Sequence, residues 1–292
     1  MFSLNLINLT ALMERTSGSP EVKIGLIDGP VVTTHPDLAG KHIREISGIN
    51  GATCTQANSY ACLHGTFVAG ILSANRNSSA PAICPNCTLL IRPIFAETTS
   101  GREHMPTATP RELAAAIIEC IESGVRVINL SLALGQPSTK GEQLLEEALA
   151  QAIRRGVIVI AAAGNQGTLG SSAITRHSWV IPVLACDRHG RPTNESNLGS
   201  SIGRRGLSAP GDGITSLGTA GRLQTLGGTS VAVPFVTGAI ALLWSEFPSA
   251  SASQIKLAIT QASIPRRPSV IPPLLDAEAV YQILWTEMRG VK

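Results

Sequence analysis

The sequence predicts an α/β protein in which helices cover both faces of a mostly parallel central sheet. Three segments carry this prediction, 22–28, 125–130 and 157–163, because each is a mainly apolar run of strand length. Strands buried on both faces form such runs, and helices between successive strands make the sheet parallel. The 292 residues, 43% hydrophobic and 15% charged, are enough to bury one large core.

The expected helices and strands alternate along the chain. Leu113, Ile117 and Ile121 repeat at helical spacing, and Gly124 ends that helix immediately before a strand. The same order of helix, glycine and strand recurs around Gly156. The predicted strands are 22–28, 89–94, 125–130, 157–163 and 179–185, with short strands and turns in 207–226. The predicted helices are 63–74, 111–122, 141–155, a long one from Ser230, 251–262 and 276–288.

We predict a single domain over residues 1–292. Residues 1–20 are expected to form a helical extension, and residues 263–292 a proline-rich link and a C-terminal helix. The N-terminal segment has no early Lys or Arg and is not a signal peptide, and the most apolar segment, 231–244, is too short to span a bilayer. A net charge of +3 without a basic block argues against nucleic-acid binding. We expect a cytoplasmic protein with no membrane or nucleic-acid partner, and its oligomeric state is left open.

Six cysteines allow three interpretations. Cys54 and Cys62 flank a polar loop, and Cys84 and Cys87 form a Cys-x-x-Cys sequence. These four can form two disulfides, Cys54–Cys62 and Cys84–Cys87, remain reduced in a reducing compartment, or bind one zinc ion together. The other two lie in apolar segments and are expected to be buried free thiols, Cys120 and Cys186.

A serine lies at the start of the most apolar helix. Gly227 and Gly228 lead through Thr229 to Ser230, and the apolar run follows at once. Free N–H groups and the dipole at a helix N-terminus favour negative charge, which suits a nucleophile whose reaction forms an oxyanion. On these residues alone, an N-cap serine on a core helix is an equally good interpretation.

Three further polar residues are expected at the same edge of the sheet. Asp28 ends a buried strand, His64 lies in the first turn of a helix, and Asn165 follows an apolar strand. The carboxyl ends of parallel strands and the helix N-termini that follow them share one crevice. The four residues can therefore converge, and the Asn165 amide can donate to a developing oxyanion.

The chain order Asp28, His64, Asn165, Ser230 resembles that of the subtilisin-like serine proteases. Residues 228–234, Gly-Thr-Ser-Val-Ala-Val-Pro, match the family motif G-T-S-x-A-x-P. Residues 64–70, His-Gly-Thr-Phe-Val-Ala-Gly, match H-G-T-x-V-A-G in full. The resemblance covers about residues 20–262 and implies a subtilisin-like three-layer α/β/α sandwich.

The resemblance also implies an activity, that of a serine endopeptidase that needs no cofactor. It makes Asp28, His64 and Ser230 a catalytic triad and assigns Asn165 to the oxyanion hole. The substrate-binding residues that it implies are Ser131, Leu132, Ala133, Leu134, Gly135 and Gly164. Structural calcium is frequent in the family, and Asp37 and Asn77 fall near one family site. Arg76 lies beside them, so no metal is expected.

Two departures from the family pattern narrow the resemblance. Gly29 follows Asp28 where the family has Ser or Thr, and residues 131–134 read Ser-Leu-Ala-Leu instead of S-L-G-G, a bulkier specificity-pocket wall. The Asp-Gly-Pro-Val sequence at 28–31, the cysteine loops and the lack of a pro-segment before this strand look like the cyanobactin maturation proteases of the PatA and PatG type. We therefore expect a peptide substrate, a ribosomally made precursor cut at one site. A catalytically weak peptide-binding module and a general degradative subtilase are the alternatives.

Overall fold

The computed structural model describes residues 2–46, 54–97, 108–132, 142–262 and 269–289. Its main sheet has seven parallel strands in the order β2-β3-β1-β4-β5-β6-β7. They are β1 (Lys23–Asp28), β2 (Ile43–Glu45), β3 (Thr88–Pro93), β4 (Val127–Leu130), β5 (Ile158–Ala162), β6 (Val180–Cys186) and β7 (Leu207–Pro210). The predicted parallel sheet is confirmed, and the short strand β2 was not predicted.

The strand order reverses next to β1. The chain runs from β1 to β3 on one side and then returns to β4 on the other, so β1 pairs with both, and Ile24 lies opposite Leu89 and Val127. Loops that leave two strands in opposite directions open a crevice at their carboxyl ends. Asp28, the last residue of β1, therefore lies where a ligand site is expected.

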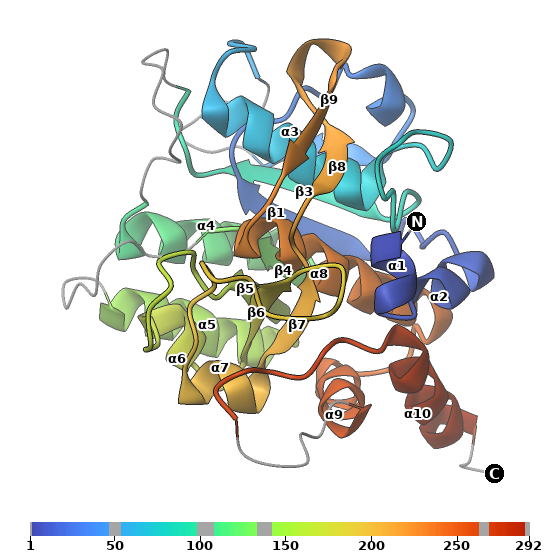
Figure 1. The fold of residues 1–292 in the computed structure, drawn as a ribbon, viewed down its shortest axis with the longest axis vertical. Coiled ribbons are helices and arrows are strands. Elements are labelled where there is room, and N and C mark those ends of the chain that lie inside the picture. The colour runs from blue at the N-terminus through green and yellow to red at the C-terminus, as the bar shows by residue number, and fades with distance from the viewer. Residues whose placement is uncertain (1, 47–53, 98–107, 133–141, 263–268, 290–292) are drawn as a thin grey trace.

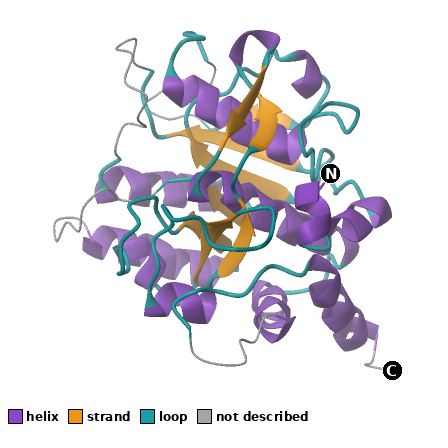
Figure 2. Ribbon diagram, in the orientation of Figure 1, coloured by secondary structure: helices purple, strands orange, loops and turns teal. Residues whose placement is uncertain are grey.

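Helices cover both faces of the sheet, as Figures 1 and 2 show. Most buried apolar residues of α3 (Tyr60–Ser73) and those of α8 (Thr229–Glu246) belong to one hydrophobic core, and those of α4 (Pro110–Glu122) and α5 (Glu142–Arg155) to a second. Both α3 and α8 are apolar on all sides because they are buried almost completely. Among the described residues, α8 is long and apolar enough to cross a membrane, and here it is the core helix.

The ends of the described chain are helical and pack together. The N-terminal segment forms α1 (Phe2–Leu6) and α2 (Leu9–Arg15), and α2 contacts α10 (Ala277–Arg289) and α8. The remaining elements are α6 (Ala173–Arg176), α7 (Ser200–Arg205), α9 (Ala252–Ala262), the hairpin β8 (Ile214–Leu217) and β9 (Leu223–Leu226), and the 3-10 turns Pro36–Leu38 and Thr219–Gly221.

The helix boundaries follow from capping residues where these are present. Thr109 and Glu112 form a reciprocal capping box, in which the Thr109 hydroxyl accepts from the Glu112 N–H and the Glu112 carboxylate accepts from the Thr109 N–H. With Pro110 in the first turn, this begins α4 one residue before the predicted start. The helix α3 also begins earlier than predicted, at Tyr60 instead of 63. These three residues add a turn ahead of His64.

Candidate active site

Asp28 and His64 form a buried pair at the carboxyl end of β1. The His64 Nδ1–H donates to Asp28 Oδ1 at 2.7 Å, and the two side chains are 3% and 0% exposed. The Gly29 N–H also donates to Asp28 Oδ1 at 2.7 Å. Because the carboxylate accepts from Nδ1, His64 is held in the tautomer whose Nε2 can accept a proton.

Gly29 allows the added turn of α3 to pack against β1. A Cβ atom on residue 29 would lie 2.0 Å from the carbonyl oxygen of Ala61, in that turn. Only glycine fits here, which explains the departure from the Ser or Thr of the family pattern. Asp28 Oδ2 is buried and has no hydrogen-bond partner among the described residues, so the support of this carboxylate comes through Oδ1 alone.

Ser230 lies in the first turn of α8, within reach of His64. The Ser230 Oγ–H can donate to His64 Nε2, and the two atoms are 3.0 Å apart. Gly228, the N-cap residue, has a φ of 120°, and its N–H donates to the Gly211 carbonyl, which fixes the turn into the helix. In the first helical turn the Ser230 N–H has no partner within the helix and is free to bind an anion.

Asn165 lies in the turn after β5, against Thr229, the residue before Ser230. Its Oδ1 accepts from the Thr229 N–H and the Thr229 hydroxyl, both at 2.9 Å. Two donors must face the oxygen, so this arrangement identifies the other end of the amide as the NH2 group. A Cβ atom on Gly228 would lie 2.8 Å from Asn165 Nδ2, so the small residue at 228 also makes room for this donor. The structure thus brings all four predicted residues together.

The residues expected to bind substrate are only partly described. Ser131 and Leu132 follow β4 and are buried, and Gly164 is buried next to Asn165, with its N–H donating to the Thr229 hydroxyl at 3.2 Å. The Ser131 hydroxyl donates to the Ser230 carbonyl at 2.9 Å. The remaining predicted residues, Ala133, Leu134 and Gly135, lie outside the described residues.

Sequence reasoning missed Thr229 as the residue that orients Asn165. Its hydroxyl both donates to Asn165 and accepts from Gly164, so it joins the β5 turn to the start of α8. The signal was present in the Gly-Thr-Ser motif, where a hydroxyl residue precedes the serine.

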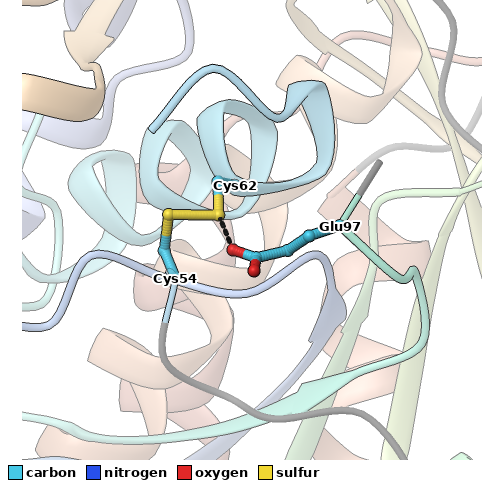
Figure 3. A group of neighbouring side chains, drawn as sticks. All are labelled: Cys54, Cys62 and Glu97. Carbon is cyan, nitrogen blue, oxygen red and sulfur yellow. Dashed lines mark hydrogen bonds between the residues drawn. A yellow bond between two sulfur atoms is a disulfide. The ribbon is translucent and has the colours of Figure 1, made fainter. Parts of the chain in front are cut away.

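The predicted Cys54–Cys62 disulfide is present, next to His64 in sequence. Figure 3 shows it with the Glu97 carboxylate lying against Cys62 Sγ. Glu97 Oε1 accepts from the Thr55 and Gln56 N–H groups at 2.7 and 3.1 Å. Burial raises the pKa of Glu97, but hydrogen bonds from the Thr55 hydroxyl and these two N–H groups outweigh it and bring the pKa below its ordinary value. Glu97, another residue missed from the sequence, therefore ties the loop after Cys54 to the end of the β3 segment.

The Cys84–Cys87 disulfide, which was one of the three interpretations, is not formed, because both residues are free thiols in the core. The Cys87 N–H donates to the Cys84 carbonyl, and the two thiols share a hydrogen bond instead of a covalent bond. This hydrogen bond raises the pKa of Cys84, as does burial, and it lowers the pKa of Cys87. A Cβ atom on residue 18 would lie 2.6 Å from Cys87 Sγ, so a glycine at this position makes room for the thiol.

The other two cysteines are buried free thiols, as predicted, and burial raises the pKa of both Cys120 and Cys186 to about 12.

A zinc site built from four thiolates is also excluded. Within the described part of the chain, the one group of three or more potential ligands whose atoms lie within 4.8 Å of one another is Cys54, Cys62 and Glu97. Cys84 and Cys87 are not in this group. The two cysteines in it, Cys54 and Cys62, are joined in the disulfide and have no free thiol for a metal.

The residues around Arg76 do not fit a calcium ion. The Arg76 guanidinium donates to the carbonyl oxygens of Met13, Thr16 and Ile83, at 2.6, 2.9 and 3.1 Å. Two of these oxygens come from the N-terminal segment and one from the segment after α3, and carbonyl oxygens are the kind of ligand that calcium takes. The guanidinium already supplies the positive charge and the contacts, and it joins the N-terminal segment to the end of the α3 region.

Comparisons with known proteins find relatives in sequence and in fold. Subtilisin DY from Bacillus licheniformis is 30% identical over 260 residues, which cover 87% of this chain and 88% of that protein. A serine-to-alanine mutant of the protease domain of PatA has a similar structure, with a TM-score of 0.85, 27% identity, and coverage of 92% of this chain and 97% of that one. The prenylagaramide maturation protease PagA has a TM-score of 0.82 and 27% identity, covering 95% and 98%.

The sequence profile of the subtilase family matches residues 19–279, which is most of the chain. The subtilases are hydrolases, and the family contains the subtilisins and thermitase. The chain belongs to the subtilase family of serine endopeptidases.

Proposed function

We propose that Asp28, His64 and Ser230 form the catalytic triad of this endopeptidase. The observation that carries the proposal is the continuous line of short contacts, 2.7 Å from Asp28 to His64 and 3.0 Å from His64 to Ser230. Ser230 Oγ attacks the peptide carbonyl carbon while its proton passes to His64 Nε2. Asp28 keeps Nδ1 protonated and stabilises the imidazolium that forms.

The oxyanion of the tetrahedral intermediate has two donors in this proposal. One is the Asn165 NH2 group, whose orientation follows from the Thr229 contacts, and the other is the Ser230 N–H at the start of α8. When the intermediate collapses, the C–N bond breaks and the leaving amine takes the proton from His64. Water then attacks the acyl-enzyme ester, giving its proton to His64, and Ser230 is regenerated. No cofactor enters these steps.

We further propose that the substrate is a ribosomally made precursor peptide, cut at one site during natural-product maturation. The support is the similarity to the PatA protease domain and to PagA, a maturation protease, over more than nine tenths of the chain. Ala133 and Leu134 stand where the family motif has glycine, and side chains there would restrict the specificity pocket. An enzyme with a narrow pocket can gain rate by binding an extended recognition sequence, because binding energy from remote parts of the substrate lowers the barrier at the reacting bond. The cytoplasmic location stays a prediction.

The test compares a cyanobactin-type precursor peptide with casein at equal enzyme concentration. Mass spectrometry of the products should find one cut in the precursor and little cleavage of casein. Ser230→Ala serves as the control for contaminating proteases. Rapid cleavage of casein at many sites would contradict the precursor proposal and identify a general degradative subtilase.

A further inference from the structure

Pro234 leaves the backbone carbonyl of Ser230 without its helical partner. In an α-helix the carbonyl of one residue accepts from the N–H four positions later, and residue 234 has no N–H because it is proline. The Ser131 hydroxyl takes the place of that donor, and its Oγ lies 2.9 Å from the Ser230 oxygen. The backbone of Ser230 is thus supported by a side chain from the segment after β4.

A line of buried hydrogen bonds continues from Ser131 into the core. The Asn129 NH2 group donates to Ser131 Oγ at 2.7 Å, and the Thr237 hydroxyl donates to Asn129 Oδ1 at 2.9 Å. Ser131, Asn129 and Thr237 are 2%, 0% and 0% exposed, so water does not replace these bonds. Thr237 lies two turns after Ser230 on α8, which means that the line leaves α8, passes through β4 and returns to α8.

Each hydrogen bond in this line can run in one direction only. The carbonyl of Ser230 can only accept, so Ser131 must donate to it and accept from Asn129. This turns the Asn129 NH2 toward Ser131 and its oxygen toward Thr237, whose hydroxyl must then donate. Loss of the last donor would leave a buried amide oxygen unpaired, and the amide would be free to reorient away from Ser131.

We infer that Asn129 and Thr237 are positioning residues that act on Ser230 through the Ser131 hydroxyl. The inference rests on the proposed role of Ser230 as nucleophile. Fixing the direction of the Ser230 carbonyl fixes ψ at the nucleophile and thereby its Cα–Cβ direction. That direction decides whether Oγ stays 3.0 Å from His64 Nε2 while it faces the substrate. A displacement of about 1 Å at a reacting group can lower the rate by about 10²-fold.

The experiment replaces Thr237 by valine, which keeps the shape and removes the hydroxyl. We expect kcat for p-nitrophenyl acetate and the rate of fluorophosphonate labelling to fall by about tenfold or more, with KM within about twofold. Thr237→Ser should restore both rates. The matched control is Thr88→Val, because the Thr88 hydroxyl is also buried and also makes one bond, to the Pro20 carbonyl at 2.8 Å, outside this line. It should lower Tm without changing kcat.

A second pair of variants separates positioning from stability. Pro234→Ala supplies an N–H that can bond the Ser230 carbonyl within the helix, so the Ser131 hydroxyl becomes dispensable. In that background Thr237→Val should change kcat by less than about twofold. If Thr237→Val does not fold, Thr237→Ala replaces it in both backgrounds, since it also removes the hydroxyl and adds no bulk.

The possible outcomes separate a failure of the proposed function from a failure of the positioning inference. A wild-type protein that neither labels nor hydrolyses the ester contradicts the proposed function. An active wild type in which Thr237→Val lowers Tm but keeps kcat contradicts only the positioning inference. An equal loss of kcat on Thr237→Val in the wild-type and Pro234→Ala backgrounds also contradicts only the positioning inference.

Discussion

Replacement of Asn165 by alanine should lower kcat strongly and leave the fold intact. In subtilisin, a member of the same family, removal of one oxyanion-hole donor costs about 2.7–4 kcal/mol. At 1.36 kcal/mol for each factor of ten, the expected loss here is about 10²–10³ in kcat. KM should change little, because the NH2 group acts on the charge that develops in the transition state and not on the ground-state carbonyl.

The cost to stability is smaller. Asn165 is exposed, but its oxygen accepts two bonds from Thr229, which is buried and loses the acceptor for both donors. The net loss is about 1–3 kcal/mol of unfolding free energy. A variant that is still folded well below its Tm but is about 10²-fold slower therefore isolates the donor role.

The assay measures kcat and KM for p-nitrophenyl acetate with wild type, Asn165→Ala and Asn165→Asp. The aspartate keeps an oxygen for both Thr229 donors and lacks the NH2 group. Both variants should be slow. If Asn165→Ala kept kcat within about threefold, or if Asn165→Asp restored it, Asn165 would be a structural clamp for Thr229 and the oxyanion assignment would be wrong.

Three further predictions concern stability. Mass mapping without reductant should find Cys54–Cys62 as the one linked pair, and Cys54→Ser should lower the unfolding free energy by about 2–3 kcal/mol, the value for so short a loop; an additional Cys84–Cys87 link would contradict the structure. Arg76→Ala should lower Tm by the equivalent of about 1–2 kcal/mol. EDTA should leave the Tm of wild type unchanged, and added calcium should not restore that of the variant. A fall in the Tm of wild type with EDTA would contradict the claim that the guanidinium, and not calcium, holds these oxygens. Burial lowers the pKa of Lys256 to about 8, so the folded protein binds fewer protons than the unfolded chain from there to about 10.4. The stability of wild type relative to Lys256→Met, followed by urea unfolding, should therefore rise with pH in that range, and a flat difference would show an unshifted amine.

The positions of the four site residues were predictable because each lies at a place that local sequence specifies. Asp28 ends an apolar strand, Asn165 follows one, and Ser230 lies in the first turn of an apolar helix, so a parallel sheet brings them to one edge. His64 was identified by its sequence motif and by its place in the chain order of the four residues. The hydrogen bonds that orient them depend on atoms that are 36 to 166 residues apart in sequence, and no local pattern encodes these.

The errors share one physical cause, the contacts that distant segments impose on a local pattern. A Cys-x-x-Cys turn allows a disulfide, but in the folded chain both thiols are free and buried, in contact with segments that the spacing does not report, such as the one at Gly18. In the same way, the start of α3 at Tyr60 depends on the absence of a side chain at Gly29, which lets Ala61 approach. The line from Ser131 to Thr237 was invisible because its members are three separate, ordinary polar residues in the sequence.

The most direct test of the account is fluorophosphonate labelling followed by peptide mass mapping. The account predicts one adduct, on the peptide that contains Ser230, with none on Ser230→Ala and far slower labelling of His64→Ala. An adduct on another residue, or equal labelling of wild type and Ser230→Ala, would contradict the claim that Ser230 is the nucleophile of this subtilase.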